Sequence, residues 1–261
     1  MRSAWILLSA ALCLQAGAVA QEKPAEPSAA PTADSKLDFA AVTARGRALY
    51  AYDQAAWHGT DAIFALKPDV KGLAHYICTQ TPAGWIVIFP RWNDSHDQLI
   101  AVYEAKETKE KFVARKVDKP SPVDTSLVAE ERALELALAD FPAPTRPFNT
   151  AILPAPEGNY YVYVYPGQTR EDVWPIGGDV RYTISGDGKT LIEKRKLHNT
   201  ILDMQVKPKQ VGGYHNHAIS DIPEDTDVFY VLNRKPSMPE FVGTAKQLYV
   251  IEKDGNIEIG K

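Results

Sequence analysis

Residues 121–141, SPVDTSLVAEERALELALADF, predict a helix that opens the second half of the fold. Ser121 can cap this helix, Pro122 suits its first position, and Asp124 places an acid in its first turn. The apolar residues at helical spacing share one face: Leu127, Leu134, Leu138 and Phe141. The acids that fall largely on the other faces, and that we expect in solvent, are Glu130, Glu131 and Glu135. Prolines at positions 142, 144 and 147 then end the helix.

Strand patterns follow this helix, and the same order of elements precedes it. Residues 148–153, 159–165, 179–185 and 191–198 are strand-like, and Gly186-Asp187-Gly188 is typical of a hairpin turn. Upstream, a helix over 37–66 is followed by strands over 74–81, 84–90, 98–105 and 111–117. The sequence therefore predicts two units, each a helix followed by an antiparallel meander.

The first helix rests on an apolar stripe that recurs every seven residues, at Val42, Leu49, Ala56 and Ile63. Glycines at 46 and 59 each weaken it by about 1 kcal/mol relative to alanine. Two alternatives remain at residues 58–61: one continuous helix, or a break in which Thr60 caps a second helix.

The C-terminal part predicts a strand, a helix and further strands. A strand runs through His217, an acidic loop covers 221–227, a helix covers 226–233, and strands cover 240–244, 247–253 and 256–259. The fold class is therefore α+β: two helix-plus-antiparallel-meander units followed by a strand-helix-strand segment. We divide the folded chain into an N-terminal unit, 36–118, and a C-terminal domain, 119–261.

The N-terminus carries the features of a secretory signal. Arg2 supplies the positive charge, residues 4–14 form a short apolar core, and Ala18-Val19-Ala20 is a small-residue cleavage site. We expect cleavage after Ala20 and a periplasmic or secreted protein with no transmembrane segment in the mature chain, because the apolar run is too short to span a bilayer. Residues 21–35, rich in Ala and Pro, predict a disordered tether.

Composition narrows the possible partners. The 261 residues are 45% hydrophobic with a formal net charge of −4, which supports a globular core and argues against binding to nucleic acid or anionic membranes. Cys13 lies in the signal segment, so Cys78 is alone in the mature chain and no internal disulfide can form. Its place in an apolar strand predicts a buried thiol.

His215 and His217 are the two histidines that lie close together in the sequence. In a strand, a spacing of two puts both imidazoles on one face, with Cα atoms roughly 6.5–7 Å apart, which suits one metal ion. His198 and Asp203 form an alternative metal pair. The remaining histidines, at 58, 75 and 96, show no ligand-like spacing.

Val211-Gly212-Gly213-Tyr214-His215-Asn216-His217, followed by an acidic loop, a helix that opens on an Asp and two strands, resembles the C-terminal half of the JAMM (JAB/MPN-type) zinc peptidases. The resemblance covers about residues 205–259. It implies zinc held by His215, His217 and Asp227, with Asp221 or Asp225 as substitutes for Asp227, and a water in the fourth position. It also implies a glutamate that polarises this water, for which Glu157 is the candidate.

Two functions fit these observations. The first is a non-catalytic envelope module that binds another protein or a cell-wall ligand. The second is a zinc-dependent peptidase or hydrolase that uses His215, His217 and Asp227. Bound zinc, lost when both histidines are replaced, would favour the second.

Overall fold

The structure is a computed structural model that describes residues 38–119 and 121–260. The predicted signal at 1–20 and the tether at 21–35 lie outside the described residues. Within the described part of the chain, no helix combines the length and hydropathy needed to cross a bilayer. Helices and antiparallel sheets are both present, which confirms the α+β class.

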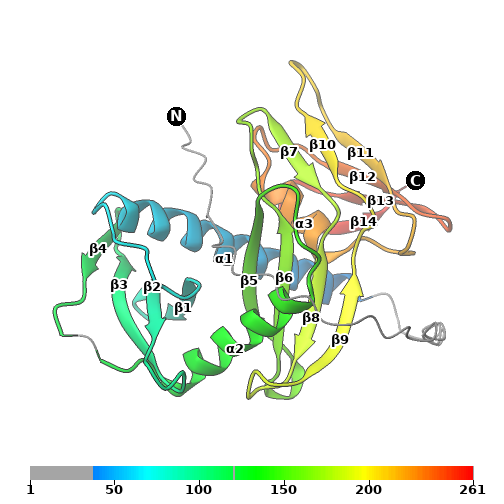
Figure 1. The fold of residues 1–261 in the computed structure, drawn as a ribbon. Helices are drawn as coiled ribbons and strands as arrows, with labels where there is room; N and C mark the ends of the chain where they lie inside the picture. Colours follow the sequence, from blue (N-terminus) through cyan, green and yellow to red (C-terminus); the bar gives the residue numbers. More distant parts are fainter. Residues whose placement is uncertain (1–37, 120, 261) are drawn as a thin grey trace.

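Helix α1, Phe39–Phe64, runs through the middle of the molecule (Figure 1). The Asp38 side chain caps it by accepting a hydrogen bond of 2.9 Å from the Ala41 amide. The helix is continuous through residues 58–61, so the predicted alternative of a break there is wrong. Gly59 is buried against β2, where a Cβ atom would overlap the Val87 side chain. Close packing, and not a break, therefore accounts for this glycine.

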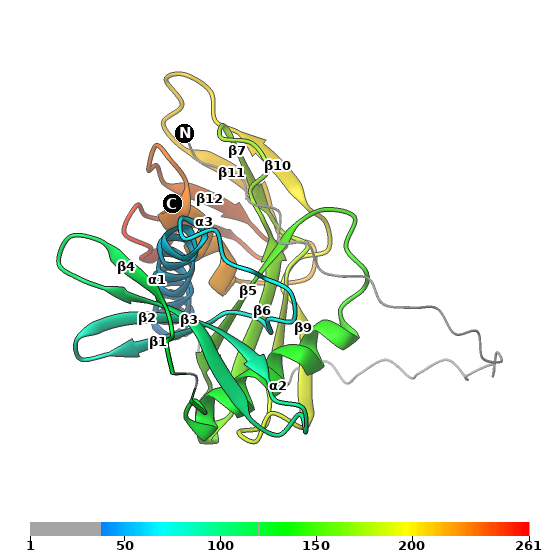
Figure 2. The same cartoon turned by 60° about the vertical axis from the view of Figure 1, so that its left-hand side comes forward.

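The first sheet is an antiparallel meander in the order β1-β2-β3-β4. Its strands are β1 Ile77–Thr81, β2 Gly84–Trp92, β3 Leu99–Glu107 and β4 Phe112–Lys116. Leu49 and Ile63 of α1 are buried in one cluster with Val87 and Phe89 of β2. Cys78 lies in this core as predicted, and burial raises the pKa of its thiol. Figure 2 shows the sheet beside α1.

The second sheet has the order β5-β6-β8-β9 and a helix on each face. Its strands are β5 Phe148–Pro154, β6 Tyr160–Pro166, β8 Val180–Ile184 and β9 Leu191–Lys196; α2 is Thr125–Asp140, and the short 3₁₀ turn η1 is Pro156–Gly158. Val162 and Val164 pack in the cluster that contains α2. Tyr163 and Tyr165 pack in the cluster that contains α1. This alternation along β6 is the period of two that a strand imposes. The apolar cluster around α1 contains residues from both sides of residue 118, where we had divided the chain into two units.

Glu131 corrects the prediction that the α2 acids form a solvated face. Its side chain is fully buried, and its carboxylate accepts a 2.8 Å hydrogen bond from His75 Nδ1. Burial lowers the pKa of His75, but Glu131 outweighs this effect and raises it. The prediction failed because β1 and the chain before it cover this side of α2.

The third layer contains a two-stranded ribbon and a mixed sheet. The ribbon pairs β7 Val173–Ile176 with β10 Leu202–Gln205. The sheet has the order β11-β12-β13-β14, in which β11 Gly213–Asn216 is parallel to β12 Glu240–Gly243, and β13 Leu248–Ile251 and β14 Ile257–Ile259 continue antiparallel. Helix α3, Asp225–Asn233, connects β11 to β12.

Helix α3 is held directly against α1. A Cβ atom at Gly46 would overlap Val228 and the Asp225 carbonyl, so only glycine permits this approach. The buried Asp225 carboxylate forms ion pairs with Arg45 of α1 at 2.9 Å and with Arg181 of β8 at 2.6 Å. These contacts fix the N-terminus of α3 relative to the second sheet, and with it the acidic side chains of the first turn of α3.

Candidate metal centre

Four side chains from three parts of the chain meet at one point. They are His198, just after β9; His215 of β11; His217, just after β11; and Asp227, in the first turn of α3. Their potential ligand atoms all lie within 4.8 Å of one another, and all four side chains are buried.

The imidazole Nε2 atoms surround the Asp227 carboxylate. His215 lies 3.0 Å from Oδ1, His198 lies 3.1 Å from Oδ1, and His217 lies 3.0 Å from Oδ2. The Nε2 atom of His217 is also 3.0 Å from that of His198 and 3.3 Å from that of His215. Three ring nitrogens and a carboxylate thus face the same small volume.

The other nitrogen of each ring is held by a hydrogen-bond acceptor. Nδ1 of His198 lies 2.7 Å from Asp179, and Nδ1 of His215 lies 3.0 Å from Glu240. Nδ1 of His217 lies 3.0 Å from the Ile222 carbonyl oxygen. Ionised carboxylates and carbonyls only accept, so Nδ1 carries the hydrogen and Nε2 of each neutral ring presents a lone pair. This pairing is typical of metal-bound histidines.

The charge pattern suits positive charge at the centre, supplied either by a metal ion or by a protonated His198 that donates to Asp227. Neutral rings would turn three lone pairs and a carboxylate toward one another with no hydrogen between them, and fully protonated rings would oppose N–H groups at 3.0 Å. Burial would lower the pKa of His198, but without an ion Asp179 and Asp227 outweigh it and raise the pKa to about 11. Burial would raise the pKa of Asp227, yet the three histidines hold it well below its usual range. A metal cation satisfies all four groups together.

Asp227 occupies its position because it belongs to a capping box at the start of α3. Its Oδ2 accepts a hydrogen bond of 2.6 Å from the Glu224 amide, while Glu224 pairs with Arg195 at 2.7 Å. The helix N-terminus further favours a carboxylate at this point. The same residue therefore begins the helix and faces the histidines.

Glu240 connects His215 to a buried arginine. Its second oxygen lies 2.6 Å from Arg234, whose guanidinium also donates to the Met238 carbonyl at 2.7 Å. A side chain at Gly213 would overlap Glu240, so glycine leaves the room that this carboxylate needs. The orientation of His215 therefore depends on an ion pair in the core.

The structure brings together His215, His217 and Asp227 and adds His198, which the sequence had paired elsewhere. Asp203, its expected partner, instead forms an ion pair with Arg146 at 3.0 Å. The only sequence signal for His198 was a histidine at a strand end.

The alternative acids have other partners. Asp221 pairs with Lys246 at 2.6 Å, and Asp225 is held by Arg45 and Arg181. Glu157 lies in the exposed turn η1 and is not part of the group of ligand atoms.

A small cavity of about 50 Å³ borders His198 and His215. Its other lining residues come from the end of β7 and the glycine after it, from the loop between His198 and β10 with Leu202, and from β11 and the chain after His217. No carboxylate lines it. A small molecule could approach the histidines from this side.

No protein-family model matches the chain, and comparisons with curated proteins and with solved structures give no match either. The resemblance of residues 205–259 to JAMM peptidases remains a prediction.

Proposed function

We propose that this protein is an exported, non-catalytic binding module stabilised by one zinc ion, held by His198, His215, His217 and Asp227. The observation that carries this proposal is the anchoring of all three Nδ1 atoms, which turns three Nε2 atoms toward one carboxylate. Each ligand is thus presented in the form that binds a metal.

The ligand set favours zinc in a structural role. Imidazole nitrogens with one carboxylate suit Zn²⁺, and four protein ligands are typical of a closed, structural site, whereas catalytic sites keep one position for water. Such an ion would tie the chain after β9, strand β11 and helix α3 to one another. Val228, Tyr230 and Val231 of α3 already pack in an apolar cluster with β7, β12 and β13, and the ion would add a direct link from α3 to β11 and to the chain after β9.

The sequence supports the location and the kind of partner. Residues 1–20 have the pattern of a secretory signal, which places the mature chain in the periplasm or outside the cell. In that location, the partner would be another envelope protein or a cell-wall ligand.

Metal analysis of the full chain, exported through its own leader and purified without chelator, tests the ion. We expect one equivalent of zinc per chain, and its loss in a His198→Ala, His215→Ala double variant. His58→Ala is the matched control, because His58 is an exposed histidine outside the group. A protein that stays metal-free after reconstitution with zinc, or a double variant that keeps its zinc, would contradict the proposal.

A zinc-dependent hydrolase is the second candidate, and the cavity beside His198 and His215 is the observation that favours it. In this case the ion would also bind a water there and would itself have to activate it, because no carboxylate lines the cavity and Glu157 lies outside it. The zinc-loaded protein would then cleave fluorogenic peptides, and the His198→Ala, His215→Ala variant would not. The hydrolase candidate would be excluded by two results together. The zinc-loaded protein would cleave no peptide, and acetohydroxamate would leave the absorption spectrum of the cobalt-substituted protein unchanged.

A further inference from the structure

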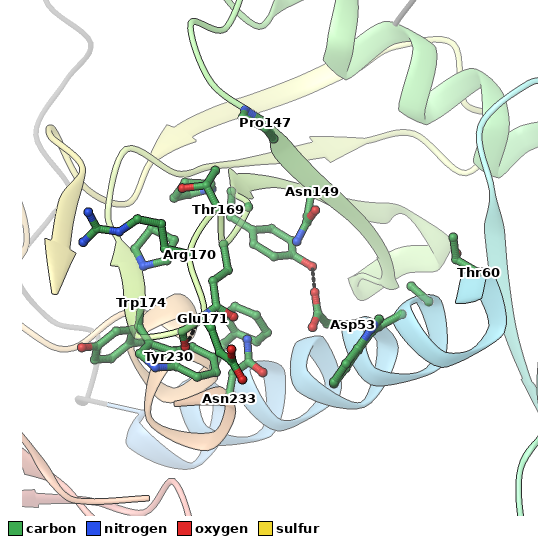
Figure 3. A pocket seen from close by; sticks show the side chains of 18 of the residues that line it. Asp53, Thr60, Pro147, Asn149, Thr169, Arg170, Glu171, Trp174, Tyr230 and Asn233 are labelled. Atoms are coloured by element: carbon green, nitrogen blue, oxygen red, sulfur yellow. Dashed lines mark hydrogen bonds between the residues drawn. The ribbon is translucent and has the colours of Figure 1, made fainter. Parts of the chain in front are cut away.

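A second cavity, larger than the one beside His198, lies between α1, β6, the loop before β7, and α3. Its volume is about 480 Å³, within the range of sites for small organic molecules. It shares no lining residue with the metal group. Figure 3 shows side chains from these elements around the opening.

Aromatic side chains form much of the cavity wall. They are Trp57, Phe64, Tyr76, Tyr165, Trp174, Phe229 and Tyr230. The negative faces of aromatic rings attract cations, and clusters of such rings bind alkylammonium groups. Apolar walls alone would also accept a neutral ligand, so the charges in the cavity decide between the two.

Asp53 is the partly buried charge in this wall. Its Oδ1 accepts a hydrogen bond of 2.7 Å from the Tyr165 hydroxyl, drawn as a dashed line in Figure 3, and Oδ2 has only a 3.5 Å contact from Gln54. Among residues 38–119 and 121–260, no Lys, Arg or His nitrogen forms an ion pair with Asp53. Burial raises the pKa of Asp53 to about 6, which is the expected behaviour of a carboxylate without a cationic partner.

The rest of the lining adds no compensating positive charge. Arg170 and Glu171 are neighbours in the exposed loop at the mouth of the cavity and offset each other. Asp61 is also exposed and adds a negative charge. A cation in the cavity would therefore meet a net negative field, with Asp53 as its least exposed charged group.

We propose that this cavity binds a small organic cation, whose alkylammonium group pairs with the Asp53 carboxylate against the surrounding aromatic rings. Asn149 and Asn233, which also line the cavity, offer amide groups to a polar part of the ligand. The ligand class is a primary or quaternary amine with an apolar body.

Calorimetric titration of the full mature protein with choline and with benzyltrimethylammonium tests this proposal, and 3,3-dimethyl-1-butanol serves as the uncharged isostere of choline. We expect both cations to bind with Kd in the millimolar range or tighter, and the isostere to bind at least about tenfold more weakly. Asp53→Asn keeps the shape and the acceptor for Tyr165 but removes the charge, and we expect it to weaken cation binding by about 10- to 100-fold. Glu252→Gln removes an exposed acid outside the cavity and should bind as the wild type does.

Three outcomes would overturn the proposal. The first is no heat of binding for either cation up to about 20 mM, which would mean that neither cation binds with the millimolar Kd that we expect. The second is equal affinity for choline and its isostere. The third is unchanged affinity in Asp53→Asn, provided that its thermal melting is cooperative. Because zinc content is measured on the same samples, failure of the metal site would be seen separately.

Discussion

At the scale of single residues, the orientation of each imidazole depends on an acceptor behind it. Asp179 holds His198, and Glu240 holds His215, through hydrogen bonds to Nδ1. Acceptors of this kind fix the tautomer and raise the basicity of the ring nitrogen that binds metal. The ligands are therefore only part of the site.

Replacement of Asp179 should weaken zinc binding without removing a ligand. We expect Asp179→Ala to lower zinc affinity by about 10- to 100-fold, because His198 loses the acceptor that orients it. Asp179→Asn keeps an acceptor oxygen and should lose less. Competition with a chromophoric chelator measures both affinities. Equal losses in the two variants would show that orientation through this hydrogen bond is not the cause.

Asp53 should make stability depend on pH in a defined direction. Its carboxyl has a pKa near 3.8 when solvated and about 6 in the fold, so the folded state binds the proton more tightly. This group therefore destabilises the fold fully above about pH 6, and the effect disappears as the pH falls below about 3.8. We expect Asp53→Asn to raise the free energy of unfolding by about 1–2 kcal/mol near pH 8 and by little near pH 4. Urea unfolding at both pH values measures this, and a gain that is independent of pH would contradict it.

At the scale of elements, α1 organises the molecule because two of its glycines admit close neighbours. Gly46 faces α3, and Gly59 faces β2. Helix propensity alone says that alanine would improve both positions by about 1 kcal/mol. An added Cβ atom at either position would overlap its neighbours, however, and crowding of a packed interface lowers the free energy of unfolding by about 1–3 kcal/mol.

We expect Gly46→Ala and Gly59→Ala each to lower the free energy of unfolding by about 1–2 kcal/mol, as packing outweighs propensity. Only Gly46→Ala should also lower zinc affinity, because it displaces the start of α3, where Asp227 lies. Chemical denaturation and zinc competition measure the two effects. Ala48→Gly, at an exposed position of the same helix, is the control for propensity alone. A stabilised Gly46→Ala variant would show that the contact between α1 and α3 can open enough to admit a methyl group.

At the scale of the whole molecule, the proposed ion acts on one side of a structure that has several cores. The clusters around α1 and α2 contain no metal ligand. The chain from His198 to α3 contains short strands and loops whose buried polar groups converge on the ion site, beside an apolar cluster that includes Val228 and Val231 of α3. Loss of the ion should therefore loosen this side and leave the rest folded.

Zinc removal should lower the melting temperature by about 5–10 °C when zinc is otherwise present at about 100 times its Kd. Hydrogen exchange should quicken over residues 198–233, while β1–β4 keep their protection. Mass-spectrometric exchange of the zinc-loaded and chelator-treated protein compares the two regions. Uniform quickening across both would show that the ion stabilises the whole fold and not one side of it.

The local elements followed from the sequence because their signals are local. The existence of α2, the period of two in β6 and the spacing of His215 and His217 each depend on a few neighbouring residues. The predicted cap of α2 was wrong: Asp124, not Ser121, caps the helix, because Pro122 is held in a β-bridge with Ile100. The ribbon of β7 and β10 was missed, since each strand has four residues and β7 contains Pro175, which weakens any strand pattern. The burial of Glu131 was missed because the covering chain lies more than fifty residues away.

By itself, the sequence determined the α+β class, the pairing of His215 with His217 at the end of one strand and the carboxylate at the start of α3. Only the tertiary structure decided that His198 completes the group, that Asp179 and Glu240 stand behind the rings, and that Asp53 faces an aromatic cavity. The physical reason is distance along the chain: spacing within one element sets which side chains share a face, whereas contacts between elements arise from packing that no local pattern encodes.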